Sequence, residues 1–96
     1  MRAGAGLGVI PEVQRAADDV EARVEEARAV GAEQLAPYEY YYAKAHLEQA
    51  QVEASEASYS DAANLAEEAD DYAQKAIEIS RAAAVQADTN GGTQTP

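Results

Sequence analysis

The chain has 96 residues, with 18 acidic against 7 basic side chains and a net charge of −11. This length provides one domain with one modest core. The negative charge argues against nucleic acid and anionic lipid headgroups as partners, because both are bound through Lys and Arg. The absence of cysteine excludes disulfides and thiolate metal sites. Alanine makes up about a quarter of the chain, which favours helices.

Residues 1–10 are rich in Gly and Ala and have no periodicity, so they are predicted to be a flexible leader. A first helix is predicted over residues 11–30. Pro11 suits its first turn, and the Glu12 carboxylate there favours the helix dipole. Gly31 is a plausible C-cap. The apolar positions recur every three or four residues, as one helical stripe requires: Val13, Ala17, Val20, Val24, Ala27 and Val30.

A second helix is predicted over residues 37–57, after a connector at 32–36. Pro37 opens this helix, as proline does at a first helical position. No apolar run here or elsewhere in the chain approaches the ~18 residues of a membrane span. The apolar stripe is Tyr40, Ala43, Leu47, Ala50, Ala54 and Ala57.

A third helix is predicted over residues 61–87, with Ser60 or Asp61 as its N-cap. The residues after it, 88–96, lack apolar side chains and are predicted to form a disordered tail. The stripe of this helix is Ala62, Leu65, Ala69, Tyr72, Ala76, Ile79 and Ala83.

These stripes predict an all-α fold, an antiparallel up-down-up three-helix bundle over residues 11–87. The alternation of three and four residues is typical of a coiled-coil seam, and short connectors make neighbouring helices antiparallel. Alanine lets helices approach closely but contributes little hydrophobic free energy. The isolated monomer is therefore expected to be modestly stable. Its larger core side chains are expected to be Tyr40, Leu47, Leu65, Tyr72 and Ile79.

No residue pattern in the chain predicts catalysis, a cofactor or a bound metal, so the chain is not expected to be an enzyme. The acidic cluster Glu67, Glu68, Asp70 and Asp71 could offer oxygen ligands to calcium or magnesium, but a rigid helix cannot wrap the roughly six to eight oxygens that calcium needs. A solvated acidic face is the preferred interpretation. The single histidine, His46, has no partner pattern of a catalytic or metal site and is expected to be half exposed.

The tyrosine run is the most unusual stretch of the chain. Successive helical residues point ~100° apart, so its side chains cannot all enter one core. With Tyr40 facing the third helix, Tyr38 and Tyr42 are expected to share another face that covers the first helix, while Tyr41 stays exposed. Either the rings seal the end of the bundle, or part of the run binds a partner, since tyrosine is enriched at interfaces. The candidate interface is Tyr38, Tyr41, Tyr42 and His46.

Two segments carry a family resemblance. They are Val30-Gly31-Ala32 with Leu35-Ala36-Pro37-Tyr38-Glu39, continuing through Ala43, Leu47 and Ala50, and the alanine-rich stretch from Tyr59 to Ala76. The chain resembles a family of Ala-rich bacterial envelope proteins, formally a domain of unknown function. Its members are often lipoproteins, and an OmpA-like peptidoglycan-binding domain often follows. The resemblance implies a periplasmic helical module at the outer membrane and brings no catalytic residues.

The sequence departs from this family in lacking an OmpA-like domain after Pro96 and a lipobox cysteine. Residues 3–6 are what a lipobox would leave if its cysteine were replaced by Ala5, although a flexible linker has the same composition. The hairpin over 38–79 also looks like a single tetratricopeptide unit, whereas solenoids need about three.

Two functions are expected from this reading. The first is a non-enzymatic structural or interaction module of the bacterial cell envelope, located in the periplasm and associated with the outer membrane. A lipoprotein subunit of a larger assembly is one such module. The alternative is a cytoplasmic tetratricopeptide-like adaptor that binds a peptide or basic segment. The expected partner is a protein or a second copy of the chain, with no nucleic acid. Membrane contact is expected only through a lipid anchor, and no residue supports contact with peptidoglycan.

Overall fold

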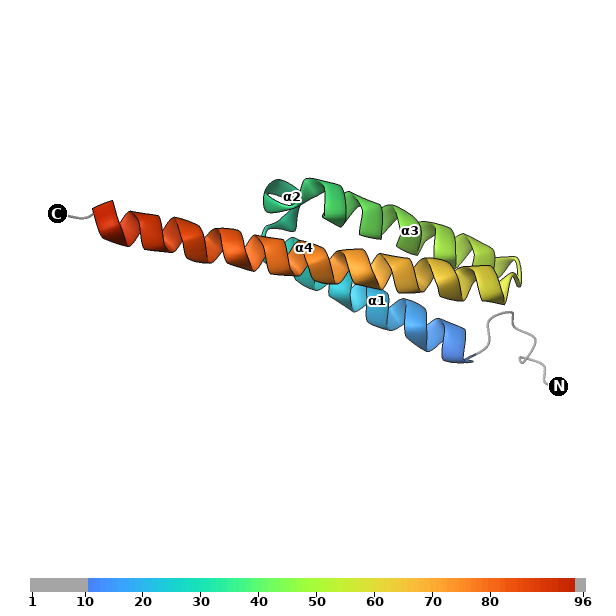
Figure 1. Ribbon diagram of the computed structural model, residues 1–96. Coiled ribbons are helices and arrows are strands. Elements are labelled where there is room, and N and C mark those ends of the chain that lie inside the picture. The colour runs from blue at the N-terminus through green and yellow to red at the C-terminus, as the bar shows by residue number, and fades with distance from the viewer. Residues whose placement is uncertain (1–10, 95–96) are drawn as a thin grey trace.

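The computed structural model describes residues 11–94, with side chains through residue 88. Its elements are α1 (Pro11–Ala29), α2 (Ala32–Leu35), α3 (Pro37–Ser55) and α4 (Tyr59–Gln94). Figure 1 shows α4 running the length of the molecule, with α3 antiparallel to it and α1 parallel to it. The predicted all-α, up-down-up three-helix bundle is confirmed. The leader predicted at 1–10, with Ala5, and the last two residues lie outside the described part of the chain.

The turn between α1 and α3 is built around Gly31, whose φ of 88° lies in the left-handed region that favours glycine. A Cβ at this position would lie 3.3 Å from Leu35 Cδ1. The predicted connector at 32–36 is instead mostly the short helix α2, closed by a 2.9 Å bond from the Leu35 N–H to the Gly31 carbonyl. One helical turn is too short to show a periodicity, so no pattern in the sequence predicts α2.

The turn between α3 and α4 is a Schellman-type helix end. The Ser58 N–H donates to the Glu53 carbonyl at 2.8 Å, and the Ala57 N–H donates to the Ala54 carbonyl at 3.0 Å. Ala57 occupies the left-handed position with φ 63° and is exposed. Its predicted place in the apolar stripe is therefore wrong. The predicted N-cap at Ser60 or Asp61 is also wrong, because α4 begins at Tyr59.

Replacing Ala57 with glycine should stabilise the bundle. A left-handed conformation costs an L-residue about 1–2 kcal/mol, and glycine removes most of that cost. We expect Ala57→Gly to raise the free energy of unfolding by about 1 kcal/mol, measured by urea denaturation followed by circular dichroism. A matched Ala45→Gly variant, inside α3, should lower it by a similar amount. Equal losses in both variants would contradict the assigned turn.

The core is built mainly from alanine, as the stripes predicted, and its largest fully buried side chain is Tyr40. α4 packs against both other long helices, most extensively against α3. The buried face of α4 follows Ala66, Ala73 and Ser80, one residue further along than the predicted Leu65, Tyr72 and Ile79. This rotation explains one error: Ile79 is 39% exposed, whereas Ile77 is buried. Leu65 and Tyr72 are half-buried at the margin of the core, and the buried set is Val20, Val24, Ala27, Ala32, Ala36, Tyr40, Ala43, Leu47, Ala50, Ala54, Ala62, Ala66, Ala69, Ala73, Ala76, Ile77 and Ser80.

The last turns of α4 extend beyond the α1–α3 turn (Figure 1). The disordered tail predicted from residue 88 is wrong for residues 88–94, whose backbone continues the helix to Gln94. Once a helix is nucleated, each further residue adds one hydrogen bond, and the alanines at 82–84 and 87 are good helix formers. A prediction from the composition of residues 88–96 alone leaves out this extension of the preceding helix.

Candidate interaction surface

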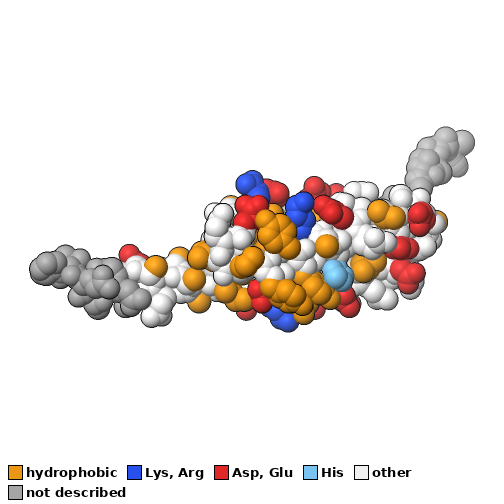
Figure 2. Space-filling model, turned by 90° about the horizontal axis from the view of Figure 1, so that it is seen from above, with side chains coloured by type: hydrophobic (Ala, Val, Ile, Leu, Met, Phe, Trp, Pro, Cys, Tyr) orange, Lys and Arg blue, Asp and Glu red, His pale blue; other side chains and the backbone are white. Residues whose placement is uncertain are grey.

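The outer seam between α3 and α4 carries a group of aromatic side chains. Tyr38, Tyr42 and His46 are spaced four residues apart on α3, so they form one column on that helix. Tyr72 projects from α4 against this column. We call these four side chains the aromatic surface. Figure 2 shows orange hydrophobic side chains around the pale blue histidine on one face of the molecule.

The rings of the aromatic surface hold one another in place. The Tyr42 ring stacks on His46, with centroids 4.0 Å apart and planes inclined by 9°. It also stacks on Tyr72 at 3.9 Å and 30°. Tyr38 meets Tyr72 edge-on at 6.2 Å and is 64% exposed. Interlocked rings lose little further conformational freedom on binding, so this surface is preorganised for contact.

Polar groups border the rings. The Nδ1 of His46 donates to the Tyr42 carbonyl at 3.0 Å, and its Nε2 lies 3.4 Å from Glu68 Oε1. The ammonium of Lys75 lies 4.5 Å from the centroid of the Tyr72 ring, a cation–π contact. Burial among these groups raises the pKa of the Tyr42 phenol, and the Glu68 carboxylate raises it further. The surroundings of Tyr42 therefore favour the neutral hydroxyl, the form that can donate a hydrogen bond.

The structure brings three of the four predicted interface residues together and leaves out the fourth. Tyr38, Tyr42 and His46 share the aromatic surface, whereas Tyr41 is 52% exposed and its ring packs edge-on against Tyr40 at 4.9 Å. The expectation that Tyr38 and Tyr42 cover the first helix is wrong: both contact Tyr72 of α4. The pairing of two helices determines which seam a side chain joins, and this does not follow from spacing along one helix.

Tyr72 belongs to the aromatic surface, although the sequence placed it only in the core stripe. Its ring contacts Tyr38 and Tyr42, and it is half-buried. The signal that could have found it is its position at the margin of the α4 stripe, opposite the tyrosine column in an antiparallel hairpin. Residues at such a margin pack on one side and face solvent on the other.

Tyr40 makes the fold sensitive to alkali. Burial raises the pKa of its phenol, and the Glu33 carboxylate adds to the rise. A pKa raised on folding means that the fold is stabilised by the neutral phenol below pH ~10, the pKa in the unfolded chain, and loses this stabilisation as pH rises through the higher folded pKa. We expect circular dichroism to show unfolding that begins above pH ~10, and Tyr40→Phe to move that onset upward. An onset unchanged in Tyr40→Phe would contradict this assignment.

The acidic residues of α4 do not converge on one point. Asp70 Oδ1 accepts from Arg23 Nε at 2.8 Å, and Glu68 faces His46, while Glu67 and Asp71 are exposed. Among the residues described, no three His, Asp or Glu side chains are placed to hold a metal ion. Within the same part of the chain, no helix combines the length and the apolar character needed to cross a bilayer.

The geometry defines a small acidic helical bundle with an aromatic patch on one seam. A family model with the description "Domain of unknown function (DUF4398)" matches residues 15–91. The match covers most of the chain, so the chain belongs to this family. No curated protein and no solved structure matches the sequence.

Proposed function

We propose that this chain is a non-enzymatic interaction module and that a protein partner binds its aromatic surface. The observation that carries the proposal is the stacked group of Tyr38, Tyr42, His46 and Tyr72, which remains accessible at the α3–α4 seam. Tyrosine is enriched at interfaces because a ring offers a large rigid contact area with a polar tip. The exposed Tyr38 ring would form the centre of the contact, with Glu68 and Lys75 as its polar border.

Two exposed tyrosines of α3 provide a matched pair for testing this proposal. Tyr38 belongs to the aromatic surface, whereas Tyr41 is exposed to a similar degree but packs on Tyr40. In native cells that express a tagged chain, Tyr38→Ala should lower recovery of the copurifying partner about tenfold, the loss typical of an interface anchor. Tyr41→Ala should leave that recovery unchanged. Equal effects of the two substitutions, with unchanged melting curves, would refute the aromatic surface as the binding site.

The cellular setting that we propose is the bacterial envelope, where the chain would serve as a lipid-anchored subunit of a larger assembly. Its resemblance to Ala-rich envelope proteins supports this, and membership of a family without assigned function is compatible with it. Metabolic labelling of the native gene product with a fatty acid, followed by membrane fractionation, tests the setting. Label in the outer-membrane fraction would support it, and unlabelled protein in the cytosol would exclude it.

A cytoplasmic adaptor that binds a basic segment is the second candidate function. A specific observation favours binding of this kind: acidic side chains border a groove between α1 and α4. The same fractionation separates the two settings. The groove is a separate feature from the aromatic surface, because α1 and α4 form it while the aromatic surface lies between α3 and α4.

A further inference from the structure

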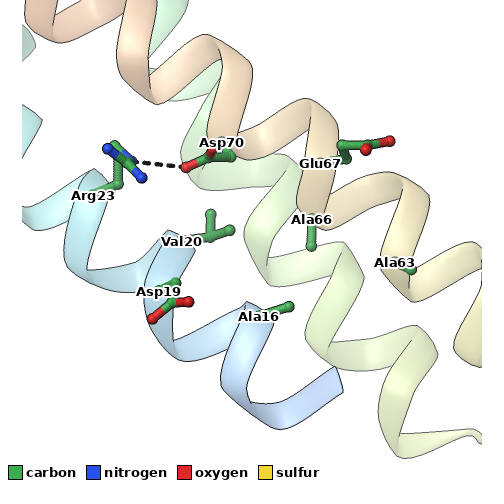
Figure 3. A pocket seen from close by; sticks show the side chains of 8 residues that line it. All are labelled: Ala16, Asp19, Val20, Arg23, Ala63, Ala66, Glu67 and Asp70. Carbon is green, nitrogen blue, oxygen red and sulfur yellow. Dashed lines mark hydrogen bonds and ion pairs between the residues drawn. The ribbon is translucent and has the colours of Figure 1, made fainter. Parts of the chain in front are cut away.

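An open groove of about 320 Å³ lies between α1 and α4. Figure 3 shows Ala16 and Val20 of α1 facing Ala66 of α4 across it, and the pair Arg23–Asp70 spanning one end. Small apolar side chains form its floor, among them Ala16, Val20 and Ala66. The ion pair, at 2.8 Å, fixes the distance between the two helices at that end.

The groove adjoins a second, almost entirely apolar cavity of about 150 Å³ where α1, α3 and α4 meet. Ala16, Ala63 and Ala66 line both spaces, and Val13 of α1 and Ala50 of α3 help to enclose the cavity. The cavity exists because alanines line all three helices at this end of the bundle. A dry apolar cavity of this size accommodates a group about as large as a benzene ring.

Two carboxylates stand on opposite sides of the groove. Asp19 lies on α1 and Glu67 on α4, and both side chains are exposed. Within the described residues neither has an ion-pair partner, in contrast to Asp70, which binds Arg23. With a net charge of −11 on the chain, the potential at this groove attracts cations and repels nucleic acid and anionic lipid.

We propose that the groove between α1 and α4 binds a basic amphipathic peptide segment of another protein. One apolar side chain of that segment enters the cavity beside Ala16 and Ala63, and its Lys or Arg side chains pair with Asp19 and Glu67. The apolar floor and the acidic sides of the groove together favour a peptide that is both basic and apolar. A purely polar cation would leave the cavity empty, and an uncharged apolar peptide would leave the two carboxylates without partners. The inference rests on the second candidate function, for which it names the site and the chemistry of the peptide. The site lies on a different seam from the aromatic surface.

The test measures binding of a fluorescent peptide to the full chain by anisotropy. The peptide is a helix of about four turns made only of leucine and lysine at amphipathic spacing. Two companion peptides replace either its leucines with alanine or its lysines with glutamine. Both replacements should weaken binding about tenfold, because each removes one of the two contributions. Binding by the alanine peptide as tight as by the parent would overturn the role of the cavity.

The two carboxylates are tested against a control of equal charge. Asp19→Asn with Glu67→Gln should raise Kd about fivefold, the scale of two solvent-exposed charge pairs. The control Glu21→Gln with Glu78→Gln removes the same charge from exposed positions of the same helices that do not line the groove. It should change Kd less than twofold. Equal effects would mean general electrostatic attraction and would overturn the site.

The cavity is tested by filling it from the protein side. Ala16 is exposed at the groove, so Ala16→Leu places its own side chain where the peptide's apolar group would lie. It should raise Kd about tenfold with an unchanged or higher Tm. The control Ala29→Leu, at the other end of α1, should bind as the parent does. Unchanged binding by Ala16→Leu, or by Ala63→Leu if the first variant fails to fold, would overturn the proposal. Tyr38→Ala should leave peptide binding unchanged.

Discussion

Leu47→Asp should unfold the bundle at room temperature. Leu47 is 6% exposed in the middle of α3 and is one of the few core side chains larger than alanine. The substitution removes its apolar contacts and places a carboxylate among the buried apolar side chains of the core. The expected loss is about 4 kcal/mol or more, which is most of the stability that a core of this size can supply. Far-ultraviolet circular dichroism should show the loss of helix.

The matched control is Val52→Asp on the same helix. Val52 is 45% exposed, so its substitution leaves the carboxylate in water and should change the free energy of unfolding by less than about 1 kcal/mol. An unchanged melting curve for Leu47→Asp would refute the packing of α3 against α4. A similar loss in both variants would show that any added negative charge destabilises this acidic chain.

Ala73→Leu should destabilise the bundle by about 3 kcal/mol through overpacking. Ala73 is fully buried in the α4 core, where its small side chain allows the neighbouring helices to approach closely. A leucine there requires the helices to separate, which also reduces contacts among the neighbouring alanines. Chemical denaturation should show a lower midpoint. The control Ala84→Leu lies on an exposed face of α4 and should be close to neutral.

The opposite result for Ala73→Leu would be informative. A stabilised variant would mean that space is available at this position and that the alanine seams are loosely packed. Ala16, at the open end of the bundle, is where added volume should instead be tolerated, because it lines the cavity. The two positions therefore distinguish a close helix contact from an open end within one bundle.

Helix type and topology could be predicted because the apolar stripes recur over many turns. Val20, Leu47 and Ala69, for example, are all buried as their spacing requires. The prediction of buried residues failed on part of α4, which packs against two other helices. Ile79 fits the predicted stripe of α4 but is exposed, because the packing of α4 against α1 and α3 turns Ala73, Ile77 and Ser80 to the core instead.

The candidate site could be predicted only in part, for a related reason. The four-residue spacing of Tyr38, Tyr42 and His46 places them in one column, which the sequence shows directly. The addition of Tyr72 and the separation of Tyr41 depend on the rotation of α3 against α4. The groove between α1 and α4 depends on the packing of residues more than 40 positions apart, for which periodicity has no signal.

Photocrosslinking in native cells tests whether the partner binds at the aromatic surface. A benzophenone amino acid replaces Tyr38 in the aromatic surface, or Val52 on the same helix away from it. We expect one discrete crosslinked band from position 38 and no such band from position 52. Adding His46→Ala, which disturbs the stack on Tyr42, should suppress the band from position 38. The same band from both positions, or a band from position 52 alone, would contradict the claim that the aromatic surface is where the partner binds.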